Sequence, residues 1–173
     1  MNKNFFDHFG LPIGFLPDAK ELRSKYLAFS KANHPDYAAG DDAAYEQALI
    51  QTSLNNQAYK TLSDDFERIR YTLELLGEPI VQEDKLPPMF LMDMMEWNER
   101  IMEAGMNDNK VVLDTLTKEF DTLESTFDVG MQELLSAYEK SQDKADLKEI
   151  KNSYLQRKYL LRLRESINKF ARL

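Results

Sequence analysis

The residues with the clearest capacity for chemistry are His34 and Asp36, which flank Pro35. An imidazole and a carboxylate at this spacing could exchange protons, or they could contact another protein from a stiff loop. Proline disfavours helical angles at the preceding residue, so a helix is expected to end at His34. A catalytic pair needs a pocket that adjusts its pKa, and an exposed loop provides none. We therefore expect a contact site rather than an enzyme.

The rest of the sequence offers no second set of catalytic or ligand-binding residues. It contains two histidines and no cysteine, which excludes disulfides and thiolate metal sites. Neither a glycine-rich phosphate loop nor a cluster with metal-ligand spacing is present. We expect neither a cofactor nor a metal ion.

Helices are predicted on both sides of the tripeptide, over about 18–33, 41–62 and 66–76, with Asp18 as the first N-cap. Apolar residues recur at helical spacing and predict core-facing stripes. These are Leu22, Tyr26 and Phe29, then Tyr45, Leu49, Thr52, Tyr59 and Leu62, then Phe66, Ile69, Leu73 and Leu76. Two long antiparallel helices would bury a small core and leave the tripeptide exposed between them.

The outer face of the helix over 18–33 is basic. Lys20, Arg23 and Lys31 lie opposite the apolar stripe, around Leu27, and Lys25 lies near the edge of the stripe. Such residues usually form only a solvated face. In a chain with a net charge of −8, an uninterrupted basic face favours a docking surface instead.

The clearest boundary in the chain lies between Gly77 and Pro88. Glycine is typical just after a helix C-terminus, and Pro79 cannot continue a helix. Pro87 and Pro88 suit the first turn of the next helix. We therefore predict a first domain over 1–77, a linker over 78–87 and a second domain over 88–173.

The second domain is predicted to be a three-helix bundle, because short loops connect antiparallel neighbours. Its helices are expected over about 88–104, from 108, and from 143 to the end. The middle helix shows a stripe close to a heptad pattern: Leu113, Leu116, Phe120, Leu123, Phe127, Met131, Leu134 and Tyr138. The last helix has two stripes: Leu147, Ile150, Tyr154 and Leu161, and Leu160, Leu163, Ile167 and Phe170.

The helix over 88–104 contains five of the eight methionines and the only tryptophan. One narrow arc is assigned to the core: Phe90, Met94, Trp97 and Ile101. A second apolar arc holds Leu91, Met95 and Met102, with Met92 further round beside Glu99. Surplus methionine suits an adaptable protein-binding patch. Alternatively, two neighbouring helices bury both arcs.

Composition and charge exclude several other classes. A net charge of −8 argues against a nucleic-acid binder. No apolar run approaches the roughly 18 residues of a membrane span, and the N-terminus lacks a secretory signal. Residues 78–146 carry 17 acidic and 6 basic groups, whereas residues 147–173 carry 8 basic and 2 acidic. We expect a cytoplasmic, all-α monomer in which the basic last helix packs on the acidic middle segment.

The tripeptide, placed between two antiparallel amphipathic helices of which the first is basic, resembles the J-domain. This module binds ATP-dependent chaperones of the DnaK type. The resemblance implies that His34, Pro35 and Asp36 stimulate ATP hydrolysis by that partner. It also implies a basic docking surface, formed by Lys20, Arg23, Lys25 and Lys31.

Three segments narrow the resemblance to HscB-type co-chaperones, which serve iron–sulfur cluster assembly: residues 6–12, 56–62 and 90–96. The order of J-domain, short linker and three-helix bundle is also similar. The resemblance implies a DnaK- or HscA-class chaperone and an IscU-type scaffold as partners. By position, the implied scaffold-contacting residues are Leu91, Met92, Met95, Glu96, Glu99 and Tyr159. A general J-domain protein that delivers other clients, and a purely structural helical adaptor, remain alternatives.

Overall fold

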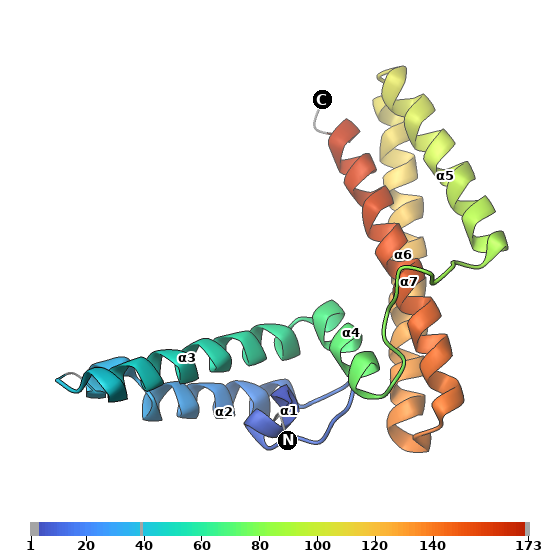
Figure 1. Cartoon of the computed structure of the whole chain (residues 1–173). Coiled ribbons are helices and arrows are strands. Elements are labelled where there is room, and N and C mark those ends of the chain that lie inside the picture. The colour runs from blue at the N-terminus through green and yellow to red at the C-terminus, as the bar shows by residue number, and fades with distance from the viewer. Residues whose placement is uncertain (1–3, 39, 172–173) are drawn as a thin grey trace. The chain divides into compact units, whose positions relative to one another are not determined.

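The computed structural model describes residues 4–38 and 40–171. Every regular element in these two ranges is a helix, which confirms the predicted all-α class. The chain divides into two compact units, Met1–Pro79 and Ile80–Leu173, whose helices are labelled in Figure 1. Among the described helices, none combines the length and the hydropathy that a membrane span requires.

The first unit is built on a pair of antiparallel helices (Figure 1). Its elements are α1 (Phe5–Phe9), α2 (Ala19–Ala32), the short 3₁₀ helix η1 (Pro35–Ala38), α3 (Asp42–Ser63) and α4 (Asp65–Leu75). Its core gathers buried side chains from α1 and the loop after it, the start of α2 and the end of α3: Phe6, Phe9, Leu11, Leu22, Ala58 and Leu62. The tripeptide therefore lies at the end of the hairpin remote from this core.

The apolar stripe predicted along α3 is wrong at its N-terminal end. Tyr45 and Leu49 are both exposed, whereas Leu62 is fully buried. Helix α1 packs on the hairpin only near its core end, so at the loop end α2 and α3 are joined only by the short η1. Two helices alone cannot enclose a side chain from all sides, and the stripe is left in solvent there.

Asn55, which no apolar pattern could reveal, lies where the buried part of α3 begins. Its side chain is fully buried. The amide nitrogen donates to the Tyr26 carbonyl at 3.2 Å and to Ser30 Oγ at 2.9 Å. Its oxygen lies 3.1 Å from His8 Nε2, and because an amide oxygen only accepts, Nε2 is the donor. One side chain thus joins α1, α2 and α3.

Replacing Asn55 should therefore loosen the hairpin that carries the tripeptide. We expect Asn55→Ala to lower the free energy of unfolding of the first unit by about 2 kcal/mol, because it leaves buried partners without hydrogen bonds. Amide hydrogen exchange along α2 and α3 measures this loss. Gln57→Ala, at an exposed position of the same helix, should change protection by less than about 0.5 kcal/mol. Equal protection in the two variants would contradict the structural role of Asn55.

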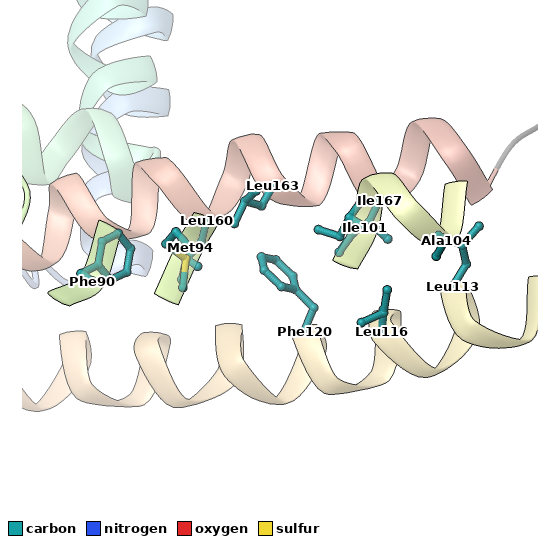
Figure 2. Close-up of a cluster of buried hydrophobic side chains, with 10 residues drawn as sticks. All are labelled: Phe90, Met94, Ile101, Ala104, Leu113, Leu116, Phe120, Leu160, Leu163 and Ile167. Carbon is teal, nitrogen blue, oxygen red and sulfur yellow. The ribbon is translucent and has the colours of Figure 1, made fainter. Parts of the chain in front are cut away.

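The second unit is the predicted three-helix bundle, composed of α5 (Pro88–Met106), α6 (Lys110–Ser141) and α7 (Lys144–Ala171). Figure 2 shows its main core, to which all three helices contribute. The buried residues of this core are Phe90, Met94, Ile101, Ala104, Leu113, Leu116, Phe120, Leu160, Leu163 and Ile167. Helix α5 is shorter than its neighbours and lies along one end of them (Figure 1).

Two predicted core positions, one on α6 and one on α7, are different. Leu135 is buried and Leu134 only partly so, and Leu161 is exposed. A straight α-helix drifts about 20° per heptad against a 3.5-residue repeat, so by Leu134 the stripe has rotated about 60° from Leu113. The next residue then faces α7 better.

The helix predicted over about 88–104 continues to Met106 and so includes Gly105. Its role is one of packing, because a Cβ atom at this position would collide with the ring of Phe170 on α7. Glycine here lets the two helices approach closely. Gly77, in contrast, has a φ of +88° directly after α4 and ends that helix as predicted.

The segment before α5 is held against the second unit. Asp84 accepts a hydrogen bond from the Val81 N–H at 2.7 Å and pairs with Lys151 of α7 at 2.7 Å. Burial alone would raise the pKa of the Asp84 carboxyl, but Lys151 and the Val81 N–H outweigh it, and the pKa is lowered. Leu86 packs against the main core. Residues 80–87 are thereby fixed to the bundle.

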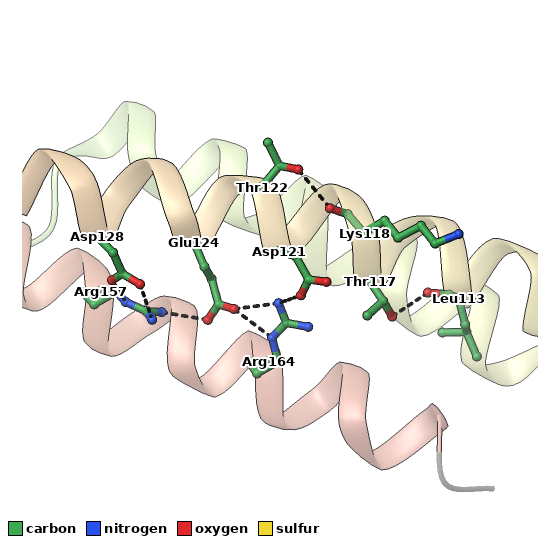
Figure 3. Close-up of polar contacts among 9 residues, drawn as sticks. All are labelled: Leu113, Thr117, Lys118, Asp121, Thr122, Glu124, Asp128, Arg157 and Arg164. Carbon is green, nitrogen blue, oxygen red and sulfur yellow. Dashed lines mark hydrogen bonds and ion pairs between the residues drawn. The ribbon is translucent and has the colours of Figure 1, made fainter.

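A network of ion pairs joins α6 to α7 (Figure 3). Glu124 accepts from Arg157 at 2.7 Å and from Arg164 at 2.6 Å, and Asp128 and Asp121 add a second carboxylate to each arginine. Burial alone would lower the pKa of Arg157, but its two carboxylate partners raise it. The expected packing of the basic last helix against the acidic middle segment is confirmed.

Glu124 is the member of this network shared by both arginines, and its side chain is only 14% exposed. We expect Glu124→Ala to destabilise the second unit by about 2 kcal/mol, because two partly buried guanidinium groups lose their acceptor. Thermal unfolding followed by fluorescence of Trp97, the only tryptophan, reports on this unit specifically. Glu133→Ala removes an exposed carboxylate of the same helix and should unfold like the parent. Coincident curves for the two variants would exclude a stabilising network.

Candidate protein-binding sites

The tripeptide loop is anchored on both sides. Helix α2 ends at Ala32, and the backbone and side-chain amides of Asn33 both donate to the Phe29 carbonyl at 3.0 Å. Thr52 of α3 donates its hydroxyl hydrogen to the Asn33 carbonyl at 3.3 Å. After His34, the chain turns into η1 through a hydrogen bond of 3.0 Å from the Tyr37 N–H to the His34 carbonyl. The loop is held in shape without burial of its polar groups.

His34 and Asp36 face one another on this loop. Their side chains are 53% and 84% exposed, with 3.5 Å between Nδ1 and the nearer carboxylate oxygen. The Asp36 N–H also lies 3.3 Å from Nδ1, so this ring nitrogen is close to both the backbone and the side chain of Asp36. The ring of Tyr37 lies at a centroid distance of 5.9 Å. This arrangement presents an imidazole, a carboxylate and an aromatic ring to solvent, as a contact surface requires.

The basic residues of α2 do not behave alike. Lys20, Arg23 and Lys31 are exposed on the outer face. Lys25 instead donates to the Gly10 carbonyl at 2.9 Å and pairs with Glu21 at 2.9 Å. Lys20, Arg23 and Lys31 therefore share the exposed outer face of α2, whereas the Lys25 side chain is turned to the loop after α1.

Helix α2 begins at the predicted N-cap. Asp18 accepts from the backbone N–H groups of Lys20 at 2.8 Å and Glu21 at 2.9 Å. The N–H groups of Glu21 and Lys20 lower the pKa of the Asp18 carboxyl. The carboxylate is thus charged at neutral pH and stabilises the turn from which the basic face starts.

The outer face of α5 is exposed, so the alternative in which neighbouring helices bury both apolar arcs is wrong. Leu91 is 36% exposed, Met92 65% and Met95 61%. Glu96 and Glu99 are exposed beside them. The face combines adaptable apolar side chains with carboxylates.

Tyr159 of α7 is only partly exposed. Its ring meets Phe90 edge-to-face at 6.0 Å between centroids and packs against the main core. Two exposed methionines of α5 were missed, Met89 and Met106. Met106 follows the predicted helix end at about residue 104, and Met89 lies in the first turn of α5.

The orientation of α5 is fixed by Trp97. Its ring meets Phe120 edge-to-face at 5.2 Å, and the Arg100 guanidinium lies 4.8 Å from the ring centroid. Arg100 in turn pairs with Glu119 of α6 at 2.6 Å. These contacts pack the Trp97 side of α5 against α6, so the side that carries Met92 and Met95 faces solvent.

Among the described residues, no group of three or more histidine or acidic side chains could hold a metal ion.

Residues 86–168 match the family model described as the HSCB C-terminal oligomerisation domain. The chain is 36% identical over 141 residues to the co-chaperone protein HscB homologue of Paraburkholderia xenovorans, covering 75% of this chain and 81% of the relative. It is 41% identical over 106 residues to the corresponding protein of Chromobacterium violaceum, covering 60% and 61%.

Two solved structures share the whole architecture. Chaperone HscB from Vibrio cholerae has a TM-score of 0.71 and 27% identity, with 96% of each chain covered. Human co-chaperone protein HscB has a TM-score of 0.77 and 23% identity, with 97% of this chain and 82% of the human chain covered. The latter likeness concerns the fold alone.

Proposed function

The chain belongs to the HscB family of co-chaperones, and we propose that it couples a DnaK- or HscA-class chaperone to an IscU-type scaffold for iron–sulfur cluster assembly. One unit activates the chaperone ATPase, and the other delivers the scaffold. The observation that carries this proposal is the exposed pairing of His34 with Asp36 on an anchored loop. We assign 1–77 to the J-domain, 78–87 to the linker and 88–173 to scaffold binding.

On the chaperone side, His34, Pro35 and Asp36 are the contact residues. Pro35 stiffens the loop, and Thr52 secures its start, so little conformational freedom is lost on docking. The exposed basic face of Lys20, Arg23 and Lys31 steers the unit toward an acidic surface of the partner. Because such steering is screened by salt, association should slow as ionic strength rises. Lys25 belongs to the same surface, but its pairing with Glu21 and Gly10 limits its share.

On the scaffold side, the contact surface is the outer face of α5. Leu91, Met92 and Met95 supply apolar area that is exposed in this chain, and burying it on binding is favourable. Glu99 adds charge within the face and Glu96 at its edge, which selects a partner with basic groups there. Tyr159 contributes through its exposed edge while its packing on Phe90 supports the face from behind.

The co-chaperone itself needs no cofactor and performs no chemistry in this scheme. ATP is hydrolysed by the chaperone, and the cluster belongs to the scaffold. We further propose that the chain acts as a monomer in the cytoplasm. Its two interfaces lie on different units, so one molecule can engage both partners.

The direct test adds the purified chain to each partner separately. With a purified DnaK- or HscA-class chaperone, the chain should raise the steady-state rate of ATP hydrolysis. With a purified IscU-type scaffold, it should form a complex detectable by calorimetry. Absence of stimulation contradicts the co-chaperone mechanism. Stimulation without scaffold binding would favour a general J-domain protein that delivers other clients.

A further inference from the structure

Helix α5 exposes an unusual number of thioether side chains. Six of the eight methionines lie between Pro88 and Met106. Five of them are exposed: Met89 by 70%, Met92 by 65%, Met95 by 61%, Met102 by 36% and Met106 by 75%. The sixth, Met94, is 2% exposed and lies in the main core (Figure 2). On α6, Met131 is 8% exposed. The chain therefore contains an exposed and a buried class of methionine.

Most of the exposed class shares one side of the helix. At about 100° per residue, Met92, Met95, Met102 and Met106 fall within an arc of roughly 80°. This arc also holds Glu99 and borders Leu91. It is the proposed scaffold-binding face, extended by two methionines toward the end of α5.

Exposed thioethers react with peroxides. The sulfur attacks one oxygen of hydrogen peroxide, an S–O bond forms as the O–O bond breaks, and the second oxygen takes the proton of the first and leaves as water. The sulfur loses two electrons and the peroxide gains two. The product, methionine sulfoxide, is polar and is reduced back by thiol-dependent sulfoxide reductases.

We propose that the exposed methionines of α5 form a reversible oxidation site, at which a peroxide weakens docking of the scaffold. The inference rests on the proposed scaffold-binding function and adds a mode of regulation to it.

The composition of the face makes a sulfoxide costly in the complex. Its charged neighbours are Glu96, Glu99 and Glu103, and ionised carboxylates accept hydrogen bonds but donate none. The guanidinium of Arg100 is engaged by Glu119. The nearest donor on α5 is the side-chain amide of the exposed Asn98, beside Met95 and Met102. A sulfoxide oxygen out of its reach is buried on docking without a partner, and each such group should weaken binding by about tenfold.

The first unit is not expected to respond. Met1 is the only methionine between residues 1 and 79, so the tripeptide and the basic face have no thioether to lose. Oxidation would then suppress scaffold binding and leave ATPase stimulation intact. Such separation distinguishes a switch from general damage.

The first measurement is the rate of oxidation at each methionine. The full chain is exposed to dilute hydrogen peroxide, and sulfoxide is quantified by peptide mass spectrometry over time. Met92, Met95 and Met106 should react at least about tenfold faster than Met94 and Met131, because the buried sulfurs are shielded. Similar rates in the two classes would overturn the proposal.

The second measurement is the affinity for a purified IscU-type scaffold before and after peroxide. The parent chain should bind at least about tenfold more weakly after treatment, and a sulfoxide reductase should restore binding. A variant with Met92→Leu, Met95→Leu, Met102→Leu and Met106→Leu should show a ratio near one, whatever its starting affinity. Met131→Leu should keep the parental loss.

Three negative results can be told apart. If the untreated chain does not bind the scaffold, the proposed function fails and the switch fails with it. If the untreated chain binds and the fully oxidised chain binds equally well, only the switch is overturned. Loss of ATPase stimulation in parallel with scaffold binding would also overturn it, since that indicates unfolding.

Discussion

The His34→Gln variant is expected to lose its stimulation of a DnaK-class ATPase down to the unstimulated rate, while the first unit stays folded. Glutamine has a similar reach but lacks the ring that pairs with Asp36 at 3.5 Å and lies near Tyr37. Because the His34 side chain is 53% exposed and outside the core, its loss costs little stability. Steady-state ATP hydrolysis at saturating co-chaperone measures the effect, and circular dichroism confirms the fold.

A matched control variant distinguishes an effect of the tripeptide from an effect of any change in surface charge. Lys60→Gln changes an exposed residue of α3 at the core end of the hairpin and should leave stimulation at the parental level. The His34→Gln chain should still bind the scaffold, because the proposed scaffold face lies on α5. Full stimulation by His34→Gln would overturn the central claim about this protein.

The second large effect is expected on the scaffold side. Simultaneous replacement of Leu91, Met95 and Glu99 by alanine should weaken scaffold binding by at least about 100-fold. Interface anchors typically cost 1–2 kcal/mol each when truncated, and three of them exceed the roughly 3 kcal/mol that this factor represents. All three side chains are exposed and alanine favours helix, so α5 should persist. Calorimetric titration with the purified scaffold gives the affinity.

A triple variant on another helix provides the control. Val111→Ala, Val129→Ala and Glu133→Ala likewise remove two exposed apolar side chains and one carboxylate, here from α6. This chain should bind the scaffold like the parent, and both triple variants should stimulate the chaperone fully. Undiminished binding by the α5 variant would contradict the assignment of the face and favour delivery of other clients.

Local rules were sufficient for the tripeptide and its helix. Asp18 accepts from the first free N–H groups of α2, and Pro35 together with Asn33 ends the helix where expected. These features depend only on groups a few residues apart, so they can be predicted from sequence. Gly77 belongs with them, because its positive φ is a property of one residue.

Which of the apolar residues are buried could not be predicted from helical spacing alone. Tyr45 and Leu49 repeat at helical spacing as regularly as Leu62, yet only Leu62 is buried, because a third element covers the hairpin at that end alone. On α6, Leu135 replaces Leu134 in the core because the direction of the neighbouring helix, and not the periodicity, decides which side chain it meets.

Polar roles were also decided by tertiary contacts. Asn55 could not be distinguished from Asn56 in sequence, but it alone of the two is buried and joins three helices. Lys25 was assigned to the basic face, yet the loop after α1 brings the Gly10 carbonyl within 2.9 Å of it. Gly105 lies just past the predicted helix end, and only the tertiary structure shows that Phe170 packs where its Cβ atom would be.

The amino-acid sequence by itself determined which residues of α5 are apolar, and it left open whether the second arc is covered. The tertiary structure decided that question, because α6 and α7 pack on the side that holds Phe90, Met94 and Ile101 and leave the methionine face in solvent. A helix pattern specifies how many apolar faces exist. The number of neighbours, which depends on contacts between residues far apart in the chain, specifies how many are buried.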